Sequence, residues 1–248
     1  KATHPISGKP FLKLSGDLST IQFDETSNIV YGKTGKDINY CVKSYTVTAK
    51  TDTPNQKSFT LKRTDLTSNG FDLLLTVSLC PDSIVRVKID DPAGKRFYVP
   101  DSSVNSKFCD VTAKRNDEAT VADFVTVSAD GSAFSLQIHE FQNPDNVYFK
   151  INDDSLIMTE YYLNLNVQIN TNQKIYGLGE RVTDFFLKEG IYTTWAMDQT
   201  DPIDDGKPPG KNIYGTHPVF FTRANTGSKY HWGMLNLNAN AQDTKVTL

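Results

Sequence analysis

Short apolar runs with a period of two residues recur along this chain and limit the folds that it can adopt. They return about every ten to fifteen residues, and clusters of Gly, Pro, Asn, Asp and Ser separate them. Helical periodicity is scarce. This layout is typical of a β-sandwich or a barrel, so we predict an all-β chain. The predicted strands cover residues 45–49, 73–79, 85–90, 124–127, 134–138, 163–169 and 232–237.

Turn-forming residues mark where these strands should end. Asp91-Pro92-Ala93-Gly94 should end one strand, and Ala129-Asp130-Gly131 should join two strands in a hairpin because Gly accepts positive φ. Residues 198–211 are rich in Asp, Pro and Gly, so they can form neither a helix nor a central strand. We predict a long exposed loop there, and loops of this kind are usually functional or disordered.

The length of 248 residues suits one substantial core or two modest ones, and all-β domains of this size often form one unit. The first forty residues are weakly patterned, as in an appended strand or a loose arm. We therefore assign residues 1–39 to an N-terminal arm or appended strands. Residues 40–248 are assigned to one β-sandwich domain.

The composition argues against several classes of function. A net charge of −3 and a pI near 5.8 carry no strong message, but nothing in the sequence resembles a basic stripe, so nucleic acid is not an expected partner. No apolar run is long enough for a membrane span. The histidines and cysteines lack metal-ligand spacing, so we expect no metal site and no cofactor.

Three cysteines, Cys41, Cys80 and Cys109, leave the redox state open. One disulfide with one free thiol fits the sequence, and so do three reduced thiols. A Cys80–Cys109 disulfide would fit a secretory compartment, where oxidising conditions preserve such bonds.

The clearest candidate for ligand binding is Asp198, which follows Trp195 by three residues. Its carboxylate can accept hydrogen bonds from sugar hydroxyls, and the indole can cover the apolar face of a pyranose ring. The structural alternative is an Asx-turn at Asp198 beside a buried tryptophan. The residue pattern alone favours this structural alternative.

Other polar clusters also favour structural roles. The four aspartates within residues 198–205 lack the spacing and the final Glu of an EF-hand, which favours a solvated acidic loop over a calcium site. Residues 177–180 lack the strand–loop–helix context of a phosphate loop, so we expect a backbone turn packed under a neighbouring loop. His217 is expected to be a hydrogen-bonded structural side chain rather than a general base.

Five further motifs follow one another in a fixed order along the chain. They are Lys-Ile-Asp-Asp-Pro-Ala-Gly-Lys-Arg-Phe-Tyr-Val-Pro at 88–100, Tyr-Gly-Leu-Gly-Glu-Arg at 176–181, Trp-x-x-Asp at 195–198, Asn-x-Tyr-Gly-x-His-Pro at 212–218 and Gly-Met-Leu-Asn-Leu-Asn-Ala-Asn at 233–240. In this order they resemble glycoside hydrolase family 31, which includes maltases, acid α-glucosidases, sucrase-isomaltases and glucosidase II. The resemblance covers roughly residues 40–248.

The resemblance implies an antiparallel, galactose mutarotase-like supersandwich that precedes the family's catalytic (β/α)8 barrel. A retaining glycosidase needs two carboxyl groups, and the family motifs that carry them lie in the barrel and do not occur in this sequence. We therefore predict that the barrel is absent from this chain and that the chain alone is inactive. The whole enzyme is expected to hydrolyse terminal α-linked glucose from maltose- or starch-like oligosaccharides.

The expected partners are the oligosaccharide substrate and the catalytic barrel. The barrel would lie on a separate chain of a processed enzyme or on the remainder of the same polypeptide. The strand faces of the sandwich should bury a large apolar interface with it, and removing the barrel would expose that patch.

The resemblance also implies a role for the Trp-x-x-Asp motif. In the family, a loop of the sandwich reaches over the barrel mouth, and its carboxylate contacts sugar near the aglycone side of the cleaved bond. Asp198 occupies that position here, and Met197 stands where many members carry Arg. We predict a substrate-binding rim made of Trp195, Met197 and Asp198.

Two other functions remain possible on the sequence alone. The alternative is a non-catalytic β-sandwich module that binds carbohydrate or a protein. A free-standing sugar mutarotase is the least favoured, because no His/Glu acid–base pair is convincing. The expected location is the secretory pathway, either lysosome-like or extracellular.

Overall fold

A computed structural model describes the greater part of the chain. It covers residues 21–24, 29–32, 37–38, 45–63, 72–94, 109–111, 118–152, 156–158, 163–169, 174–196, 209–223 and 231–247. Every regular element in this part is a β-strand or a short 3-10 helix, and all the strand pairs are antiparallel. The predicted all-β class is confirmed.

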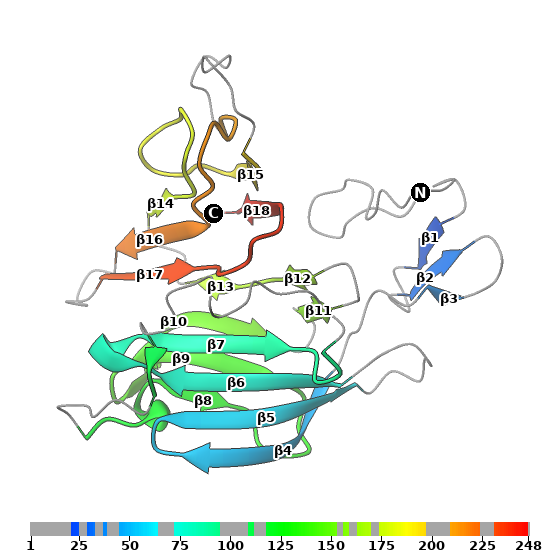
Figure 1. Cartoon of the computed structure of the whole chain (residues 1–248), viewed down its shortest axis with the longest axis vertical. Coiled ribbons are helices and arrows are strands. Elements are labelled where there is room, and N and C mark those ends of the chain that lie inside the picture. The colour runs from blue at the N-terminus through cyan, green and yellow to red at the C-terminus, as the bar shows by residue number, and fades with distance from the viewer. Residues whose placement is uncertain are drawn as a thin grey trace. The chain divides into compact units, whose positions relative to one another are not determined.

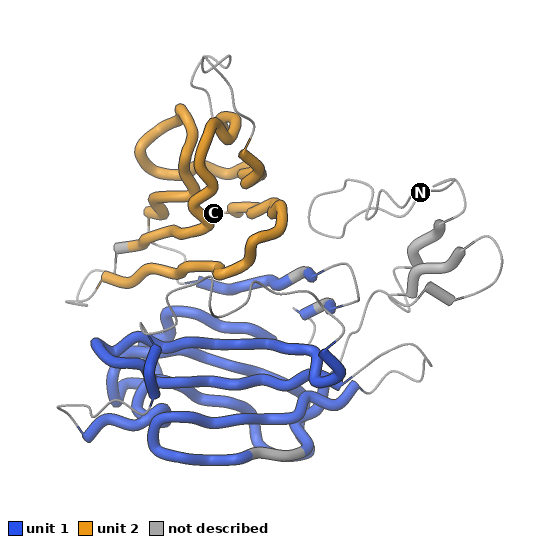
Figure 2. The backbone as a smooth tube through the Cα atoms, viewed as in Figure 1, with its two compact units in different colours: residues 1–2, 10–169 blue, residues 3–9, 170–248 orange. Residues whose placement is uncertain are grey.

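The chain divides into two compact units (Figure 2). Unit 1 contains residues 1–2 and 10–169, and unit 2 contains residues 3–9 and 170–248. The sequence patterns did not anticipate this division after Ile169. The predicted boundary between residues 39 and 40 stays a prediction. A small sheet of β1 (Ile21–Asp24), β2 (Ile29–Gly32) and β3 (Asp37–Ile38) falls before it.

Unit 1 is built on two four-stranded sheets that lie one over the other (Figure 1). One sheet has the order β4-β5-β6-β7, and the other has the order β13-β10-β9-β8. The first comprises β4 (Tyr45–Thr53), β5 (Gln56–Arg63), β6 (Leu73–Leu79) and β7 (Val85–Asp90). The second comprises β8 (Val125–Val127), β9 (Ser135–Glu140), β10 (Asn143–Asn152) and β13 (Gln168–Ile169).

Alternation in β6 shows how the sequence specifies this sandwich. Leu73, Leu75 and Val77 are fully buried, whereas Leu74 between them is 37% exposed. Apolar side chains that recur every second residue fall on one face of a strand, and that face forms the core. The second sheet contributes Leu136 and other buried residues in the same way. The strands predicted at 45–49, 73–79, 85–90, 124–127 and 134–138 are confirmed.

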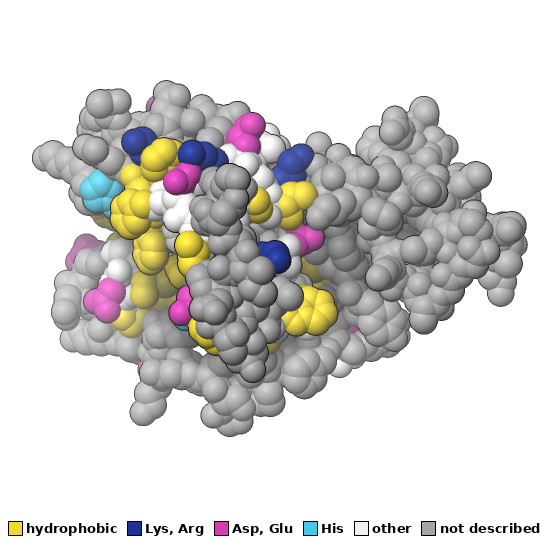
Figure 3. All heavy atoms as spheres, turned by 90° about the horizontal axis from the view of Figure 1, so that it is seen from above, with side chains coloured by type: hydrophobic (Ala, Val, Ile, Leu, Met, Phe, Trp, Pro, Cys, Tyr) yellow, Lys and Arg dark blue, Asp and Glu magenta, His cyan; other side chains and the backbone are white. Residues whose placement is uncertain are grey.

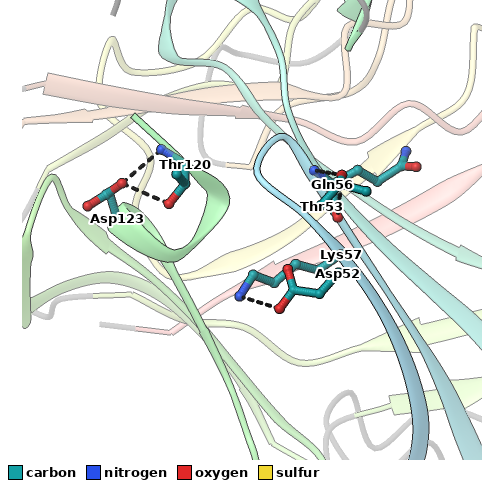
Figure 4. A network of polar contacts seen from close by, with 6 residues as sticks. All are labelled: Asp52, Thr53, Gln56, Lys57, Thr120 and Asp123. Atoms are coloured by element: carbon teal, nitrogen blue, oxygen red, sulfur yellow. Dashed lines mark hydrogen bonds and ion pairs between the residues drawn. The ribbon is translucent and has the colours of Figure 1, made fainter. Parts of the chain in front are cut away.

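Short-range polar contacts hold the connections of unit 1 (Figure 4). At the β4–β5 turn, the Thr53 hydroxyl donates to the Gln56 carbonyl at 3.0 Å and accepts from the Gln56 amide at 3.1 Å. Asp123 accepts hydrogen bonds from the Thr120 amide at 2.8 Å and the Thr120 hydroxyl at 2.9 Å, which closes a capping box. These hydrogen bonds lower the pKa of Asp123 below its ordinary value of 3.8, and the one from the backbone amide of Thr120 has the largest effect.

The predicted turns are present. The amide of Ala93 donates to the Asp91 carboxylate at 2.8 Å, and the amide of Gly94 donates to the Asp91 carbonyl at 3.0 Å. Gly131 has φ +77° between β8 and β9, as expected of a glycine that turns a hairpin.

A disulfide joins Cys80, at the end of β6, to Cys109, with the two Cα atoms 4.6 Å apart. The sequence left open either one disulfide or three reduced thiols, and the structure has the disulfide, between Cys80 and Cys109. Cys41 lies outside the described residues.

The prediction of one continuous strand over residues 163–169 is wrong. Leu163–Leu165 forms β12 and pairs with β11 (Leu156–Met158), whereas Gln168–Ile169 forms β13 and pairs with β10. Apolar and polar residues alternate in the sequence through both pieces, but the backbone changes sheet between them. Periodicity reports which face is buried and not which strand is the partner.

Unit 2 is less regular. It contains a three-stranded sheet in the order β14-β16-β17 and a two-stranded ribbon, β15-β18 (Figure 1). The strands are β14 (Ile175–Gly177), β15 (Gly190–Thr194), β16 (Val219–Arg223), β17 (His231–Leu235) and β18 (Gln242–Val246). The last strand predicted from the sequence, at 232–237, corresponds to β17 but ends two residues earlier.

The described residues contain no helix of the length and apolarity that a membrane span requires.

Candidate functional site

Two of the sequence motifs bind each other in unit 2. The amide of Glu180 donates to the Gly215 carbonyl at 3.1 Å, and the amide of Gly215 donates to Oε2 of Glu180 at 2.8 Å. The amide of Ile213 donates to the Glu180 carbonyl at 2.9 Å. Residues 176–181 and 212–218 therefore form one backbone-locked structure.

The side chain of Asn212 completes this lock. It is buried, and its Nδ2 donates to the carbonyls of Gly215 at 2.7 Å and Glu180 at 3.2 Å. An amide group that bridges two backbone carbonyls in a buried place stabilises both segments at once. Its role in this structure is structural.

Glycine at position 177 lets a neighbouring strand come close. Gly177 has φ +119°, and a Cβ atom there would lie 2.4 Å from the Val219 carbonyl oxygen. The amide of Leu178 donates to that same oxygen at 2.8 Å. The expected close packing of this backbone is present, with strand β16 as the neighbour at Gly177 and the loop of residues 212–218 as the neighbour at Glu180.

Arg181, the last residue of the first motif, binds four backbone carbonyls. Its Nε donates to Leu178 at 2.7 Å, and its Nη2 donates to Thr193 at 2.7 Å. Its Nη1 donates to Gly210 at 2.8 Å and to Pro209 at 3.2 Å. The guanidinium carbon also lies 5.3 Å from the centroid of the buried Tyr192 ring, in cation–π geometry.

Trp195 follows directly after β15, and its side chain is 63% exposed. The sequence left open a buried indole, for which Trp195→Ala would cost several kcal/mol. The exposed ring removes that expectation. An exposed tryptophan presents an apolar face and one N–H donor, which are the features that recognise a sugar ring.

The other two predicted rim residues, Met197 and Asp198, lie outside the described residues, as do the acidic residues up to 205. Their roles stay predictions. The described histidines do not suggest catalysis. His139 is buried with its ring nitrogens beside the Glu140 carbonyl and the Thr126 hydroxyl, at 2.9 and 3.3 Å.

His217 is exposed. The hydrogen bonds found for it among the described residues come from its backbone, whose amide donates to the Gly179 carbonyl at 2.8 Å. The structural role is therefore carried by the backbone rather than by the ring. Within the described ranges, no group of three or more His, Cys, Asp or Glu side chains could hold a metal ion.

The sequence did not reveal the parts played by Arg181 and Asn212. Both side chains bind carbonyls that are distant in sequence, and no periodicity encodes such contacts. The one available signal was that each residue belongs to a motif rich in glycine, which marks close backbone approaches.

Comparisons with known proteins agree with this architecture. Residues 74–242 match the family model described as the glycosyl hydrolase 31 N-terminal galactose mutarotase-like domain. The match includes both locked motifs and the Trp-x-x-Asp segment.

Similar curated proteins are glucosidases. A probable alpha/beta-glucosidase of Arthroderma benhamiae is 30% identical over 164 residues, which are 65% of this chain and 18% of that protein. The lysosomal acid alpha-glucosidase of Tetrahymena pyriformis is 29% identical over 67% of this chain and 17% of its own length. A probable maltase-glucoamylase 2 of Homo sapiens is 28% identical over 92% of this chain and 8% of its own length. The chain thus spans less than a fifth of the length of these relatives.

Solved structures show the same fold. A crystal structure of the ER glucosidase II heterodimeric complex matches with a TM-score of 0.59 and 14% identity, covering 82% of this chain and 28% of that chain. The Tris-bound glucosidase II alpha subunit matches with a TM-score of 0.56 and 15% identity over the same shares.

Proposed function

The chain belongs to glycoside hydrolase family 31 as its N-terminal galactose mutarotase-like domain, and from this premise we propose that it serves a retaining α-glucosidase. In this proposal it braces the catalytic barrel and contributes Trp195, Met197 and Asp198 to the substrate rim. The substrate is terminal α-linked glucose in maltose- or starch-like oligosaccharides. The glucosidase names of the relatives support this substrate class.

The exposed indole of Trp195 is the observation that carries the rim proposal. The ring stands at the end of β15, two residues past a carbonyl that Arg181 holds. Asp198 is three residues further along the chain. A flat apolar face followed closely by a carboxylate can both stack on a pyranose ring and accept its hydroxyl protons.

An apolar sheet face in unit 2 supports the bracing role. Tyr176 of β14 pairs with Phe221 of β16, so their side chains share a face of the sheet. Val219 lies two residues before Phe221 and therefore on the same face, and it pairs with Leu235 of β17, which puts Leu235 on that face as well. Phe221 and Leu235 are 56% and 55% exposed, and Phe185, whose ring lies 5.1 Å from that of Tyr176, is 86% exposed.

We name Tyr176, Phe185, Phe221 and Leu235 the apolar face. Hydrophobic side chains of the described residues reach the surface among charged ones in the space-filling view (Figure 3). Exposed apolar side chains gathered on and beside one sheet face often mark an interface, and the barrel is the partner that we propose for this one.

The proposal gives the chain no hydrolytic activity of its own. A retaining mechanism needs a nucleophilic carboxylate and an acid/base carboxyl about 5 Å apart. We assign both to the barrel. Glu180 is engaged with the Gly215 amide, which suits a structural carboxylate.

The Cys80–Cys109 disulfide supports a location in the secretory pathway, because such bonds persist in oxidising compartments. The name of one relative, the lysosomal acid alpha-glucosidase of Tetrahymena pyriformis, points the same way. We propose a lysosome-like or extracellular enzyme.

Maltose hydrolysis tests the function. The natively purified protein is assayed beside recombinant residues 1–248, and activity is expected in the native protein only. Activity of residues 1–248 alone would disprove the non-catalytic role. If neither sample hydrolyses maltose while residues 1–248 bind maltooligosaccharides by calorimetry, a carbohydrate-binding module becomes the better function.

Asp198→Ala in the native enzyme tests the rim. It should raise the KM for maltose and leave the melting temperature unchanged, because a rim carboxylate contacts substrate rather than core. Asp130→Ala, in the exposed β8–β9 turn of unit 1, is the matched control. A fully active Asp198→Ala enzyme would contradict the assignment.

A further inference from the structure

We infer that Arg181 is a positioning residue. Its guanidinium acts as a clamp that binds the backbone on both sides of the substrate-rim segment, which runs from Thr193 to Pro209. The inference rests on the proposed function only for its consequence in catalysis. The clamp itself stands on the described contacts.

The four backbone acceptors found for Arg181 among the described residues lie on three separate stretches of chain. Thr193 precedes Trp195 by two residues, on the outgoing side of the rim segment. Pro209 and Gly210 lie on its returning side. Leu178 belongs to the motif that is locked to residues 212–218. One side chain therefore joins both ends of the rim segment to a backbone that is itself hydrogen-bonded to residues 212–218.

Geometry explains why this residue is an arginine. A guanidinium carries five N–H donors in a rigid plane, so it can reach several carbonyls in different directions at once. A lysine ammonium is a compact point charge on a flexible stem and cannot span the same set. Hydrogen bonds from a charged donor are also stronger than neutral ones.

Gly210 and Tyr192 prepare the clamp. Gly210 has φ +65°, and a Cβ atom there would lie 2.5 Å from the Val182 carbonyl oxygen, so only glycine lets the returning chain come this close. Tyr192 is fully buried, and its hydroxyl donates to the Lys188 carbonyl at 2.9 Å. Its ring therefore gives the guanidinium a fixed surface to stack on.

Hydrogen–deuterium exchange of the natively purified protein tests the clamp directly. In Arg181→Lys, amides in peptides covering 191–196 and 209–213 should exchange at least about tenfold faster, since a hydrogen bond to a charged group is worth roughly a factor of ten to a hundred. The Leu187 amide, which donates to the Ile175 carbonyl, should stay within about twofold because it lies outside the clamp.

Lys174→Arg is the matched control. It makes the reverse exchange in the same unit, at the cation–π contact 4.8 Å from the Phe186 ring. It should alter no exchange rate in residues 191–196 or 209–213. If Arg181→Lys also leaves those rates unchanged, or if it speeds exchange equally at Leu187, Arg181 is an ordinary stabilising residue and the inference is overturned.

Catalysis provides the second readout. If the clamp orients the rim, Arg181→Lys should lower kcat/KM for maltose by roughly tenfold to a hundredfold, as misplacement of a substrate contact by about 1 Å does. If Arg181 contributed only its positive charge, the Arg181→Lys enzyme would keep the kcat/KM of the parent. A parent enzyme that does not hydrolyse maltose would defeat the proposed function, whereas the exchange result would still decide the clamp.

Discussion

The two units of this chain reach a defined structure by different means. Unit 1 has long ladders, such as the eight-residue β5 between β4 and β6, and most of its buried side chains are aliphatic. Unit 2 has strands of at most five residues, and single side chains tie its loops together. The difference separates a scaffold that is stabilised by buried area from a region that is positioned by specific polar contacts.

This division of labour suits a binding role for unit 2. Binding groups are commonly placed on loops that a rigid scaffold supports, and loops need polar partners for their backbone. In unit 2, the partners are Arg181, Asn212 and Glu180. They leave aromatic rings such as Trp195 and Phe185 free to remain exposed.

The largest expected effect is in the core of unit 1. Leu75→Ala should lower the free energy of unfolding by about 2–5 kcal/mol, because Leu75 is fully buried and the surrounding sandwich cannot collapse into the cavity. Leu74→Ala, one residue away on the other face of β6, should cost clearly less. Urea unfolding followed by far-UV circular dichroism measures both. Equal losses would show that β6 does not have one core face.

Sequence alone predicted much of unit 1, and β6 shows why. Its alternation identified the strand, its ends and its buried face, since each depends only on residues close in sequence. Residues 163–169 show the limit. The same alternation runs through β12 and β13, but partner choice depends on distant strands. Periodicity could not show that the backbone passes between two sheets.

Unit 2 was predicted by motif rather than by periodicity. The motifs that contain Gly177 and Asn212 indicated the family and a turn packed under a loop. They could not reveal that Arg181 binds carbonyls of Thr193 and Gly210, because those contacts form only after distant segments meet. The rim assignment of Asp198 came from the resemblance and stays a prediction.

A pair of glycine substitutions sharpens the contrast between the units. Gly94 and Gly210 have nearly equal φ angles, +64° and +65°. A Cβ atom added at Gly94 would have no atom within 4 Å, whereas one added at Gly210 would lie 2.5 Å from a carbonyl oxygen. Gly94→Ala should cost about 1–2 kcal/mol for the left-handed backbone alone. Gly210→Ala should cost about 1–3 kcal/mol more, as overpacking does.

Tryptophan fluorescence follows unit 2 selectively in this experiment, because both tryptophans of the chain, Trp195 and Trp232, belong to it. The unfolding transition of Gly210→Ala, followed by tryptophan fluorescence, should therefore have its midpoint at a lower urea concentration than that of the parent. Gly94→Ala should shift mainly the transition seen by circular dichroism. Equal costs for the two glycines would mean that the returning chain can move away from Val182 freely.

Trp195→Ala should separate binding from stability. The exposed ring predicts a change in the free energy of unfolding within about 0.5 kcal/mol. Covering about 50 Å² of ring with a sugar contributes about 1 kcal/mol, so the KM for maltose of the native enzyme should rise roughly five- to tenfold. Trp195→Phe should recover part of that loss. A large drop in stability with unchanged KM would assign the ring to packing instead.

The smallest expected effect concerns the capping box in unit 1, where polar contacts act locally rather than between distant segments. Hydrogen bonds from Thr120 lower the pKa of Asp123 below 3.8, so the folded protein binds that proton less readily than the unfolded chain. The contribution of Asp123 to stability is therefore full above pH 3.8 and is lost as the pH falls through the lowered pKa.

Asp123→Asn should cost about 0.5 kcal/mol at pH 6. The difference between parent and variant should shrink as the pH falls below 3.8, as urea unfolding at pH 6 and in acid would measure. A difference that persists in acid would mean that the hydrogen bonds of Asp123 do not depend on its charge.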